Sequence, residues 1–377
     1  MPISQKGLTP IAAVPVFLAV ICYFFWGSII EPDRLKASKH VLEGAKTIPI
    51  PNGHGPEGLE FDPQGGGPYV GVTDGRILKW SGEELGWVDF AHTSPHRNNC
   101  TRDAVVPSCG RPLGLTFDRK TGDLYICDGY FGLMRVGPEG GLAELLLGDV
   151  EGRNVTFANQ GDIDEEDGIY YFNDSSDQYH FGEVFYVSIS GDKVGRVVRY
   201  DIKKKEAKVI MDKLHLPNGL AASKDGSFVV ICEGGTSILH RLWVKGPKAG
   251  TSEVFARVPG LPDNIRRTPS GDFWVALHCK YNFFTRLFLS HSLIGKTVMK
   301  ILKMETVIHL MNGGKPHGIV MKLSGETGEV LHMLEDSEGK TMKYVSEAYE
   351  REDGTLWFGS VYWPAVWVMN TSVYDRK

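Results

Sequence analysis

The side chains with the clearest chemical potential are carboxylates and amides that stand at turns before expected strands. They are Glu57, Asn159, Asn218, Asp263 and Asn264. Their oxygens are hard donors, and such a set suits Ca²⁺, which takes about six to eight carboxylate, amide-carbonyl and water oxygens. Zinc is disfavoured, because its sites use Cys and His ligands. The same residue types also bond their own backbone in ordinary turns, so a calcium ring and a set of turn residues both remain open.

These residues recur because the chain repeats one plan at spacings of 45 to 58 residues. A polar or Pro turn, a short strand, a Gly-containing hairpin turn and an apolar strand follow one another, as in "LPNGLAASKDGSFVVICEGG". Such self-similarity is typical of a β-propeller. The residue that enters the first strand of each repeat is, in order, Glu57, Leu113, Gln160, Asn218, Asp263 and His317. The sequence therefore predicts an all-β, six-bladed propeller over 51–370, with these residues at the mouth of a central channel.

Two histidines are candidates for proton transfer near that mouth. His278 ends the strand-like run "FWVALH", and His317 stands at the expected start of the sixth repeat. A positioned imidazole can activate water at neutral pH. Each could equally be a core histidine with its nitrogens satisfied, because His is often partly buried.

The amino end predicts a membrane anchor. Residues 8–30 contain no charge and are long enough, at 23 residues, to cross a bilayer. Bulky residues continue to the polar border, which favours an uncleaved helix over a signal peptide. Residues 1–7 carry the positive charge and should stay cytosolic, so the rest of the chain should be luminal or extracellular. We expect a juxtamembrane linker over 31–50 and a short tail over 371–377.

The cysteines and glycosylation sequons fit such an oxidising compartment. Cys100 and Cys109 bracket a short polar loop and are expected to form a disulfide. Three further cysteines lie in apolar runs and are expected to be buried free thiols: Cys127, Cys232 and Cys279. Four sequons mark possible glycosylation sites, at Asn99, Asn154, Asn173 and Asn370.

The remaining composition is that of an ordinary globular protein. A net charge of −5 argues against a nucleic-acid binder. One segment, 280–311, departs from the strand pattern, because its apolar residues interleave with basic ones at helical spacing. We expect a helical insertion between the fifth and sixth repeats. It could cover the channel mouth, lie on a membrane surface or pack on the propeller side.

Several long stretches resemble one family. "EGLEFDPQGGGPYVGVTDGRILKW", "CGRPLGLTFDRKTGDLYICDGYFGLMRV", "LPNGLA" and "FGSVYWPAVWVM" are similar to the strictosidine synthase-like proteins, which include plant homologues and the adipocyte plasma-membrane-associated protein. A more distant resemblance is to paraoxonases and regucalcin, which are calcium-dependent six-bladed hydrolases. The resemblance to paraoxonases and regucalcin implies that the five oxygen-bearing residues are calcium ligands and that His278 lies near the site. The resemblance to strictosidine synthase implies a catalytic carboxylate at Glu347, although Val345 stands where the synthase has a histidine.

Three functions follow as hypotheses. In the first, the protein hydrolyses small esters or lactones with the help of Ca²⁺. In the second, it condenses an amine with an aldehyde as strictosidine synthase does, a reaction that needs no metal. In the third, it is a non-catalytic propeller that binds other molecules. We favour the hydrolase, acting on a small-molecule substrate and held in the endoplasmic reticulum, vacuole or plasma membrane.

Overall fold

The computed structural model describes residues 39–97, 100 and 107–375. The chain divides into two compact units, Met1–Leu35 and Lys36–Lys377, and the second contains all described residues. The expected cytosolic end, 1–7, and membrane helix, 8–30, lie outside them. Within the described ranges, no helix is long and apolar enough to cross a membrane.

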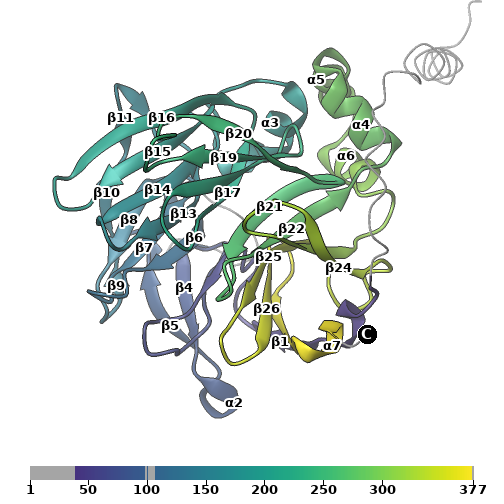
Figure 1. The fold of residues 1–377 in the computed structure, drawn as a ribbon. Helices are drawn as coiled ribbons and strands as arrows, with labels where there is room; N and C mark the ends of the chain where they lie inside the picture. Colours follow the sequence, from purple (N-terminus) through teal and green to yellow (C-terminus); the bar gives the residue numbers. More distant parts are fainter. Residues whose placement is uncertain (1–38, 98–99, 101–106, 376–377) are drawn as a thin grey trace, which may run out of the picture. The chain divides into compact units, whose positions relative to one another are not determined.

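The described residues form six antiparallel sheets around a central channel, so the predicted propeller is confirmed (Figure 1). The strands of each blade are given from the channel outward. Blade one consists of β2 (Leu59–Glu60), β3 (Tyr69–Gly71), β4 (Arg76–Trp80) and β5 (Trp87–His92), with the short β9 (Gly141–Leu142) at its edge. Blade two consists of β6 (Pro112–Phe117), β7 (Leu124–Asp128), β8 (Gly132–Val136) and β10 (Glu144–Leu147), and blade three of β13 (Ala158–Asp164), β14 (Ile169–Asp174), β15 (Gly195–Asp201) and β16 (Glu206–Leu214).

The other three blades follow the same order. Blade four consists of β17 (Pro217–Ala222), β18 (Phe228–Glu233), β19 (Ile238–Trp243) and β20 (Ser252–Arg257). Blade five consists of β21 (Gly260–Arg267), β22 (Phe273–Lys280), β23 (Gly318–Leu323) and β24 (Val330–Asp336). Blade six consists of β25 (Val345–Glu350), β26 (Thr355–Ser360), β27 (Ala365–Asn370) and β1 (Lys46–Pro49). A small ribbon of β11 (Asp149–Val150) and β12 (Arg153–Asn154) stands apart. Each innermost strand contacts the innermost strands of both neighbouring blades, which closes the ring.

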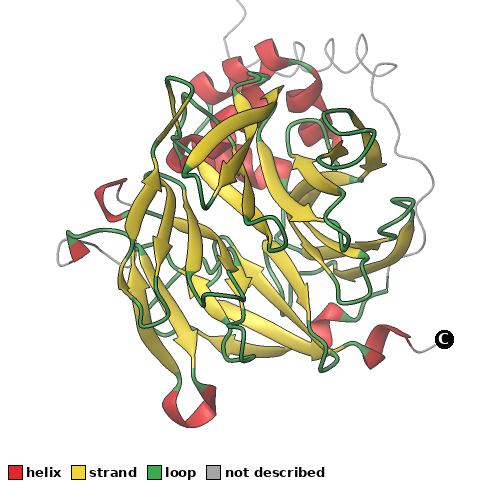
Figure 2. Cartoon of the chain, turned by 60° about the vertical axis from the view of Figure 1, so that its left-hand side comes forward, coloured by secondary structure: helices red, strands yellow, loops and turns green. Residues whose placement is uncertain are grey.

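Helices occupy only the edges of the strand body (Figure 2). The short ones are η2 (Leu42–Gly44), α2 (Gly82–Leu85), η4 (Pro107–Cys109), η5 (Phe181–Glu183), α3 (Val184–Ser190) and α7 (Ser372–Asp375). The expected insertion over 280–311 is helical, as α4 (Phe283–Ser290), α5 (Ser292–Ile301) and α6 (Met304–Met311). It connects β22 to β23 and therefore lies inside the fifth blade. We had expected it between the fifth and sixth repeats.

The sixth repeat begins elsewhere than the sequence indicated. His317 precedes β23, the third strand of blade five, whereas the innermost strand of blade six is β25. The helical insertion separates β23 from its hairpin partner by almost forty positions, and this made β23 resemble the start of a new repeat. The linker over 31–50 is also corrected in part, because β1 pairs with β27 as the outermost strand of blade six.

Hydrophobic residues pack between the faces of neighbouring blades. One such layer joins Tyr69 and Ile77 of blade one to Leu115, Phe117 and other side chains of blade two. The axis itself is crowded, because a Cβ on Gly219 would lie 2.6 Å from the Asp263 carbonyl oxygen of the next blade. A residue with a side chain would clash there, which explains why the aligned residue of most repeats is followed by Gly.

The cysteine predictions are confirmed. Cys100 and Cys109 form a disulfide with 5.8 Å between their Cα atoms, in the connection from blade one to blade two. The three thiols expected to be buried and free are so. Burial raises the pKa of Cys127 to about 12, which keeps that thiol protonated and unreactive.

The sequons divide into three groups. Asn99 lies outside the described residues. Asn154 and Asn370 are exposed and stay predicted glycosylation sites. Asn173 is fully buried, and its amide nitrogen donates to the backbone oxygens of Asn218 and Gly219 at 2.7 and 3.0 Å. This packing leaves no room for a glycan, so the expectation for Asn173 is wrong for the folded domain.

Candidate metal site at the entry mouth

The five predicted ligand residues lie together at one end of the channel. We call this end the entry mouth, because the innermost strands begin there: Glu57 precedes β2, Asn159 lies in β13, Asn218 in β17, and Asp263 and Asn264 in β21. Four of the five side chains keep a buried oxygen without any hydrogen-bond partner among the described residues, namely Glu57 Oε2, Asn159 Oδ1, Asn218 Oδ1 and Asn264 Oδ1. Buried polar atoms are nearly always satisfied in proteins, so this concentration makes the entry mouth the candidate position for a cation.

A repeated irregularity of the strands directs these side chains. The pairing register skips Asn159 and Gln160 in β13, Asn218 and Gly219 in β17, and both Asp263 and Asn264 in β21. Each skip adds one residue relative to the partner strand, which is the definition of a β-bulge. A bulge releases adjacent residues from strict alternation, so their side chains can reach the channel. The sequence signal for these bulges is the polar pair itself, which we had assigned to a turn.

Hydrogen bonds orient two of the three amides, those of Asn159 and Asn218, whereas both amide atoms of Asn264 lack a partner among the described residues. The Asn159 nitrogen donates to Ser175 Oγ at 3.1 Å, and this hydroxyl donates to the Pro217 carbonyl oxygen at 2.6 Å. With its nitrogen engaged, Asn159 presents its oxygen in the opposite direction. The Asn218 side chain hydrogen-bonds the Asp263 carboxyl group and thereby holds blade four against blade five.

Burial dominates the electrostatics of the carboxyl groups at the entry mouth. Burial raises the pKa of Glu57 to about 7, with Arg111 opposing the shift and Glu347 adding to it. Burial also raises the pKa of Asp263 well above its usual range, and the neighbouring Glu57 carboxylate raises it further. Two buried carboxyl groups that disfavour each other's ionisation would both ionise readily beside a divalent cation. The residues thus fit Ca²⁺.

The chemistry of the donor set is narrow. Within the described ranges, no three His, Cys, Asp or Glu side chains cluster as metal ligands. The entry mouth offers two carboxylates and three amides, a composition suited to a hard cation and unsuited to zinc or copper.

A small cavity of about 60 Å³ opens onto these oxygens. Glu57, Asn159, Asn218 and Asp263 line it, whereas Asn264 is not among its lining residues. The rest of the lining is largely apolar and comes from α3 and neighbouring loops: Phe157, Phe181, Val184, Phe185, Leu216, Val361 and Tyr362. This apolar wall was not predicted from the sequence, although the aromatic residues of "FGEVFYVSIS" were a visible signal.

His278 lines the same cavity, as its motif implied. Its ring meets Tyr362 edge-on at 6.0 Å and lies nearly parallel to Tyr344 at 6.1 Å. Its Nε2 atom is buried and has no hydrogen-bond partner in the described part of the chain. Burial, and then the neighbouring His317, lowers the pKa of His278 to about 4, so the imidazole is neutral at physiological pH.

The other two catalytic candidates lie away from the cavity lining. His317 accepts a hydrogen bond from the Lys280 backbone N–H at 3.2 Å, which ties the start of the helical insertion to its end. Glu347 occupies the channel interior, fully buried. Its Oε1 accepts from Leu59 N at 2.8 Å, while its Oε2 accepts from Gln160 Nε2 at 2.7 Å and pairs with Arg266 Nε at 3.0 Å. These contacts hold the Glu347 side chain in the channel interior, and its catalytic role stays a prediction.

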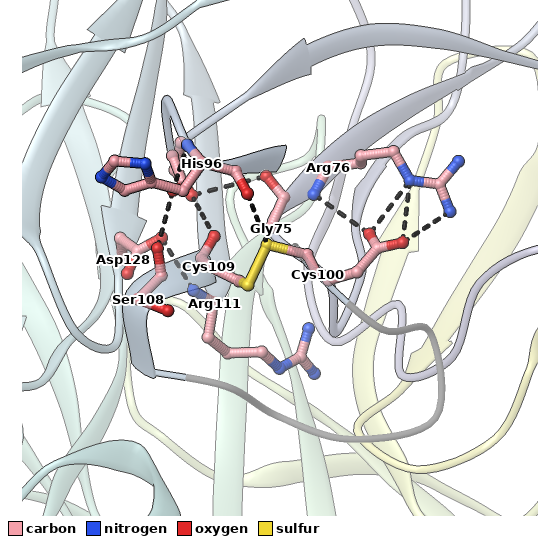
Figure 3. Close-up of a disulfide and its surroundings, with 11 residues drawn as sticks. Gly75, Arg76, His96, Cys100, Ser108, Cys109, Arg111 and Asp128 are labelled. Carbon is pink, nitrogen blue, oxygen red and sulfur yellow. Dashed lines mark hydrogen bonds and ion pairs between the residues drawn. A yellow bond between two sulfur atoms is a disulfide. The ribbon is translucent and has the colours of Figure 1, made fainter. Parts of the chain in front are cut away.

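Arg111 is a residue of this mouth that the sequence analysis did not identify. Its side chain is fully buried, packs on the Phe181 ring and donates to the Gly55 carbonyl oxygen at 2.7 Å. Its backbone N–H donates to Asp128 Oδ2 at 2.9 Å, two residues after the disulfide at Cys109 (Figure 3). The disulfide thus fixes the loop that presents Arg111. A lone charge in the apolar run "CGRPLGL" was the available signal.

Comparison with known sequences identifies close relatives. The family model described as strictosidine synthase matches residues 159–247, and the model of the strictosidine synthase-like N-terminal region matches residues 40–80. The Arabidopsis thaliana protein named strictosidine synthase-like 8 is 76% identical over 375 residues, covering 100% of both chains. Strictosidine synthase-like 9 of the same plant is 64% identical over 377 residues, again over the whole of both chains.

Solved structures with the same fold are far more distant in sequence. A gluconolactonase from Xanthomonas campestris matches with a TM-score of 0.56 and 16% identity, over 86% of this chain and 89% of that one. A calcium-binding protein from Agrobacterium tumefaciens, regucalcin, matches with a TM-score of 0.53 and 13% identity, over 88% of this chain and 93% of that one. At these identities the likeness establishes the propeller fold alone.

Proposed function

Because this chain belongs to the strictosidine synthase-like family, whose fold here is a six-bladed propeller, we propose that it is a calcium-dependent hydrolase of small esters or lactones. The observation that carries the proposal is the set of buried oxygens of Glu57, Asn159, Asn218 and Asn264 that have no partner among the described residues, together with the Asp263 carboxyl group beside Glu57 and Asn218. These five residues would hold the ion. Bound there, Ca²⁺ would polarise a substrate carbonyl group and stabilise negative charge on its oxygen.

The residues around the oxygens suit hydrolysis. His278 is neutral at physiological pH, and its unpartnered Nε2 can accept a proton from a water molecule that attacks the substrate. The apolar wall of Phe185, Tyr362 and their neighbours would bind an acyl or aromatic group and exclude bulk water. The names of the gluconolactonase and the calcium-binding regucalcin among the fold neighbours agree with the proposal.

The amine-aldehyde condensation has less support. That reaction needs a carboxylate that can take a proton, and the candidate Glu347 has both oxygens engaged by Leu59, Gln160 and Arg266. Glu347 is also absent from the residues that line the cavity, so it does not face a substrate bound there.

The test is an assay of the purified protein on phenyl acetate and small lactones, with calcium and with chelator. We expect calcium-dependent turnover that falls about 100- to 10,000-fold in His278→Gln, the usual cost of losing a general base. His317→Gln is the matched control and should keep turnover near the wild-type rate. A protein that binds calcium without hydrolysing any of these substrates would favour a non-catalytic binding role. Product from tryptamine and secologanin would favour the synthase.

We also propose that the propeller is luminal or extracellular and anchored through residues 8–30. The disulfide between Cys100 and Cys109 supports an oxidising compartment, and exposed Asn154 and Asn370 can accept glycans. Protease protection in sealed microsomes, followed by alkaline extraction, tests both parts. Release of the intact protein at high pH would contradict the anchor.

A further inference from the structure

The outward face of helix α5 (Ser292–Ile301) is unusually apolar for a solvent-exposed surface. Leu293 is 78% exposed and Ile301 is 75% exposed, two turns apart on the same side of the helix. Lys300 is also exposed and lies beside Leu293, about 20° from it around the helix axis. We call this surface, made of Leu293, Lys300 and Ile301, the α5 face. Two largely exposed aliphatic side chains beside a lysine need a partner that accepts both.

The opposite side of the helix fixes the orientation of the α5 face. Gly295 lies against α3, where a Cβ atom would overlap the backbone oxygen of Ile189. Lys296 Nζ pairs with Asp192 Oδ1 at 2.9 Å beside this contact. Since α5 packs on α3 through Gly295, it cannot rotate to bury Leu293 or Ile301 against the propeller. The α5 face therefore points outward in the folded domain.

The charge of the segment that carries the α5 face is net positive. Segment 280–311 contains five basic residues and one acidic residue, Glu305, in a chain whose net charge is −5. Two of the basic residues are already paired, Lys280 with Glu335 and Lys296 with Asp192. Within the described part of the chain, Lys300 and Lys303 form no ion pair and are exposed, so their charge is available to an external partner.

We propose that the α5 face binds the surface of an anionic lipid bilayer. Exposed aliphatic side chains on a helix insert among the acyl chains, while lysines beside them contact lipid phosphates. An anionic bilayer is the partner that fits best, because the positive charges of Lys300 and Lys303 attract a negatively charged surface. The inference is independent of the proposed hydrolase activity.

The connectivity of the chain agrees with this partner. Eight residues, 31–38, separate the proposed membrane segment from the first described residue. An extended chain of that length reaches at most about 28 Å. A domain on such a tether stays close to the bilayer, and a weak contact is strengthened by its high effective concentration.

The test uses residues 36–377, which contain all six blades and their closing strand β1, so that the apolar segment 8–30 cannot contribute. The domain is sedimented with vesicles of phosphatidylcholine alone or mixed with phosphatidylglycerol, in the presence of chelator. We expect sedimentation with the mixed vesicles that weakens as salt is raised. The double variant Leu293→Asp, Ile301→Asp should lower the partition coefficient at least about tenfold, because it removes the inserted side chains.

Two further variants keep the result interpretable. Lys300→Glu with Lys303→Glu should also lower binding to the mixed vesicles about tenfold, leaving binding to phosphatidylcholine unchanged. Leu85→Asp is the matched control, because Leu85 is 76% exposed on α2 and lies next to Glu83 and Glu84. It should bind like the wild type. Failure of the wild-type domain to bind, or equal losses from Leu85→Asp and the α5 variants, would overturn the proposal.

Discussion

The two ends of the propeller channel are built from the same innermost strands and differ in how their polar groups are satisfied. At the entry mouth, buried oxygens of Glu57, Asn159 and Asn218 have no partner. The other end, the exit mouth, is a polar basin of about 360 Å³ where the strands finish, lined by residues that include Glu60, Asp162, Asp225 and Arg267. There the carboxylates have donors. The candidate site is therefore distinguished by its unsatisfied oxygens and not by its size, because the larger cavity is the one at the exit mouth.

Backbone amides, hydroxyl groups and a lysine satisfy the carboxylates of the exit mouth. Asp162 Oδ2 accepts from Ala222 N at 2.9 Å, and Asp225 Oδ1 accepts from the hydroxyls of Ser223 and Ser227 at 2.7 and 2.8 Å. Asp164 pairs with Lys245 at 2.6 Å. A metal ion would have to displace these partners, so the exit mouth is organised for stability in contact with water.

A buried ionic layer separates the two mouths. Arg266 pairs with Glu60 at 3.1 Å and with Glu347 at 3.0 Å, and its Nη2 donates to the backbone oxygens of Leu59 and Leu115. Four of the six innermost strands, β2, β6, β21 and β25, meet in this layer. The cavities at the two mouths share no lining residue, so they are distinct.

The largest expected effect comes from breaking this layer. Arg266→Met leaves Glu60 and Glu347 buried without a counter-charge, and we expect a loss of about 3–5 kcal/mol in the free energy of unfolding. Urea unfolding followed by tryptophan fluorescence measures it. A loss below about 1 kcal/mol would mean that the two mouths are not held apart by this ion pair.

Calcium should distinguish the mouths with a smaller effect. At a hundredfold excess over its dissociation constant, an ion that binds only the folded form adds about 2.7 kcal/mol of stability, so we expect a higher melting temperature for the wild type. Asp263→Asn at the entry mouth should remove most of this rise. Without calcium it should be at least as stable as the wild type, because it removes a buried carboxyl group that Glu57 repels.

Asp225→Asn at the exit mouth is the control and should keep the full calcium response. Melting of the wild type that is indifferent to calcium and chelator would show that the entry mouth holds no metal, and the proposed hydrolase mechanism would be lost with it.

The pH dependence of stability should have opposite signs at the two mouths. Burial raises the pKa of Glu57 to about 7 from its ordinary 4.5, so between these values the folded form holds a proton that the unfolded form has released. Its contribution is present below pH 4.5 and is lost as pH rises through 7. Hydrogen bonds from Ser223 and Ser227 lower the pKa of Asp225, whose contribution is present above 3.8 and lost as pH falls.

Thermal melts in chelator from pH 4.5 to 8 test this. We expect Glu57→Gln to flatten the decline seen on the alkaline side, and saturating calcium to do the same in the wild type, since the ion favours the ionised carboxylate. Calcium affinity should rise across the same range. An affinity that is constant between pH 5 and 8 would contradict a ligand role for Glu57.

The smallest effect is expected for an exposed charge at the exit mouth. Arg119 is more than half exposed and lies 4.0 Å from Glu165, so Arg119→Met should change the free energy of unfolding by about 0–1 kcal/mol. Its calcium response should equal that of the wild type. Comparison with Arg266→Met in the same urea titration shows whether the loss of stability depends on the burial of the arginine, because both variants replace Arg by Met.

Much of this architecture could be predicted from the chain alone, because its signals are local. The spacing of Gly turns and apolar strands predicts six blades, and the polar pairs identify the entry-mouth oxygens. The short loop between Cys100 and Cys109 predicts the disulfide. Each depends on residues that are neighbours in sequence, and a propeller repeats such neighbourhoods, so the pattern becomes visible without knowledge of distant contacts.

Other features were decided by tertiary structure, because they depend on residues that are far apart in the chain. His317 and Glu347 looked alike as catalytic candidates, yet the first ties down an insertion and the second pairs with Arg266, 81 positions away. Strand β1 joins blade six only because the ring closes on itself. Residue types therefore determined which oxygens were available, and the closure of six blades decided which of them were left without a partner.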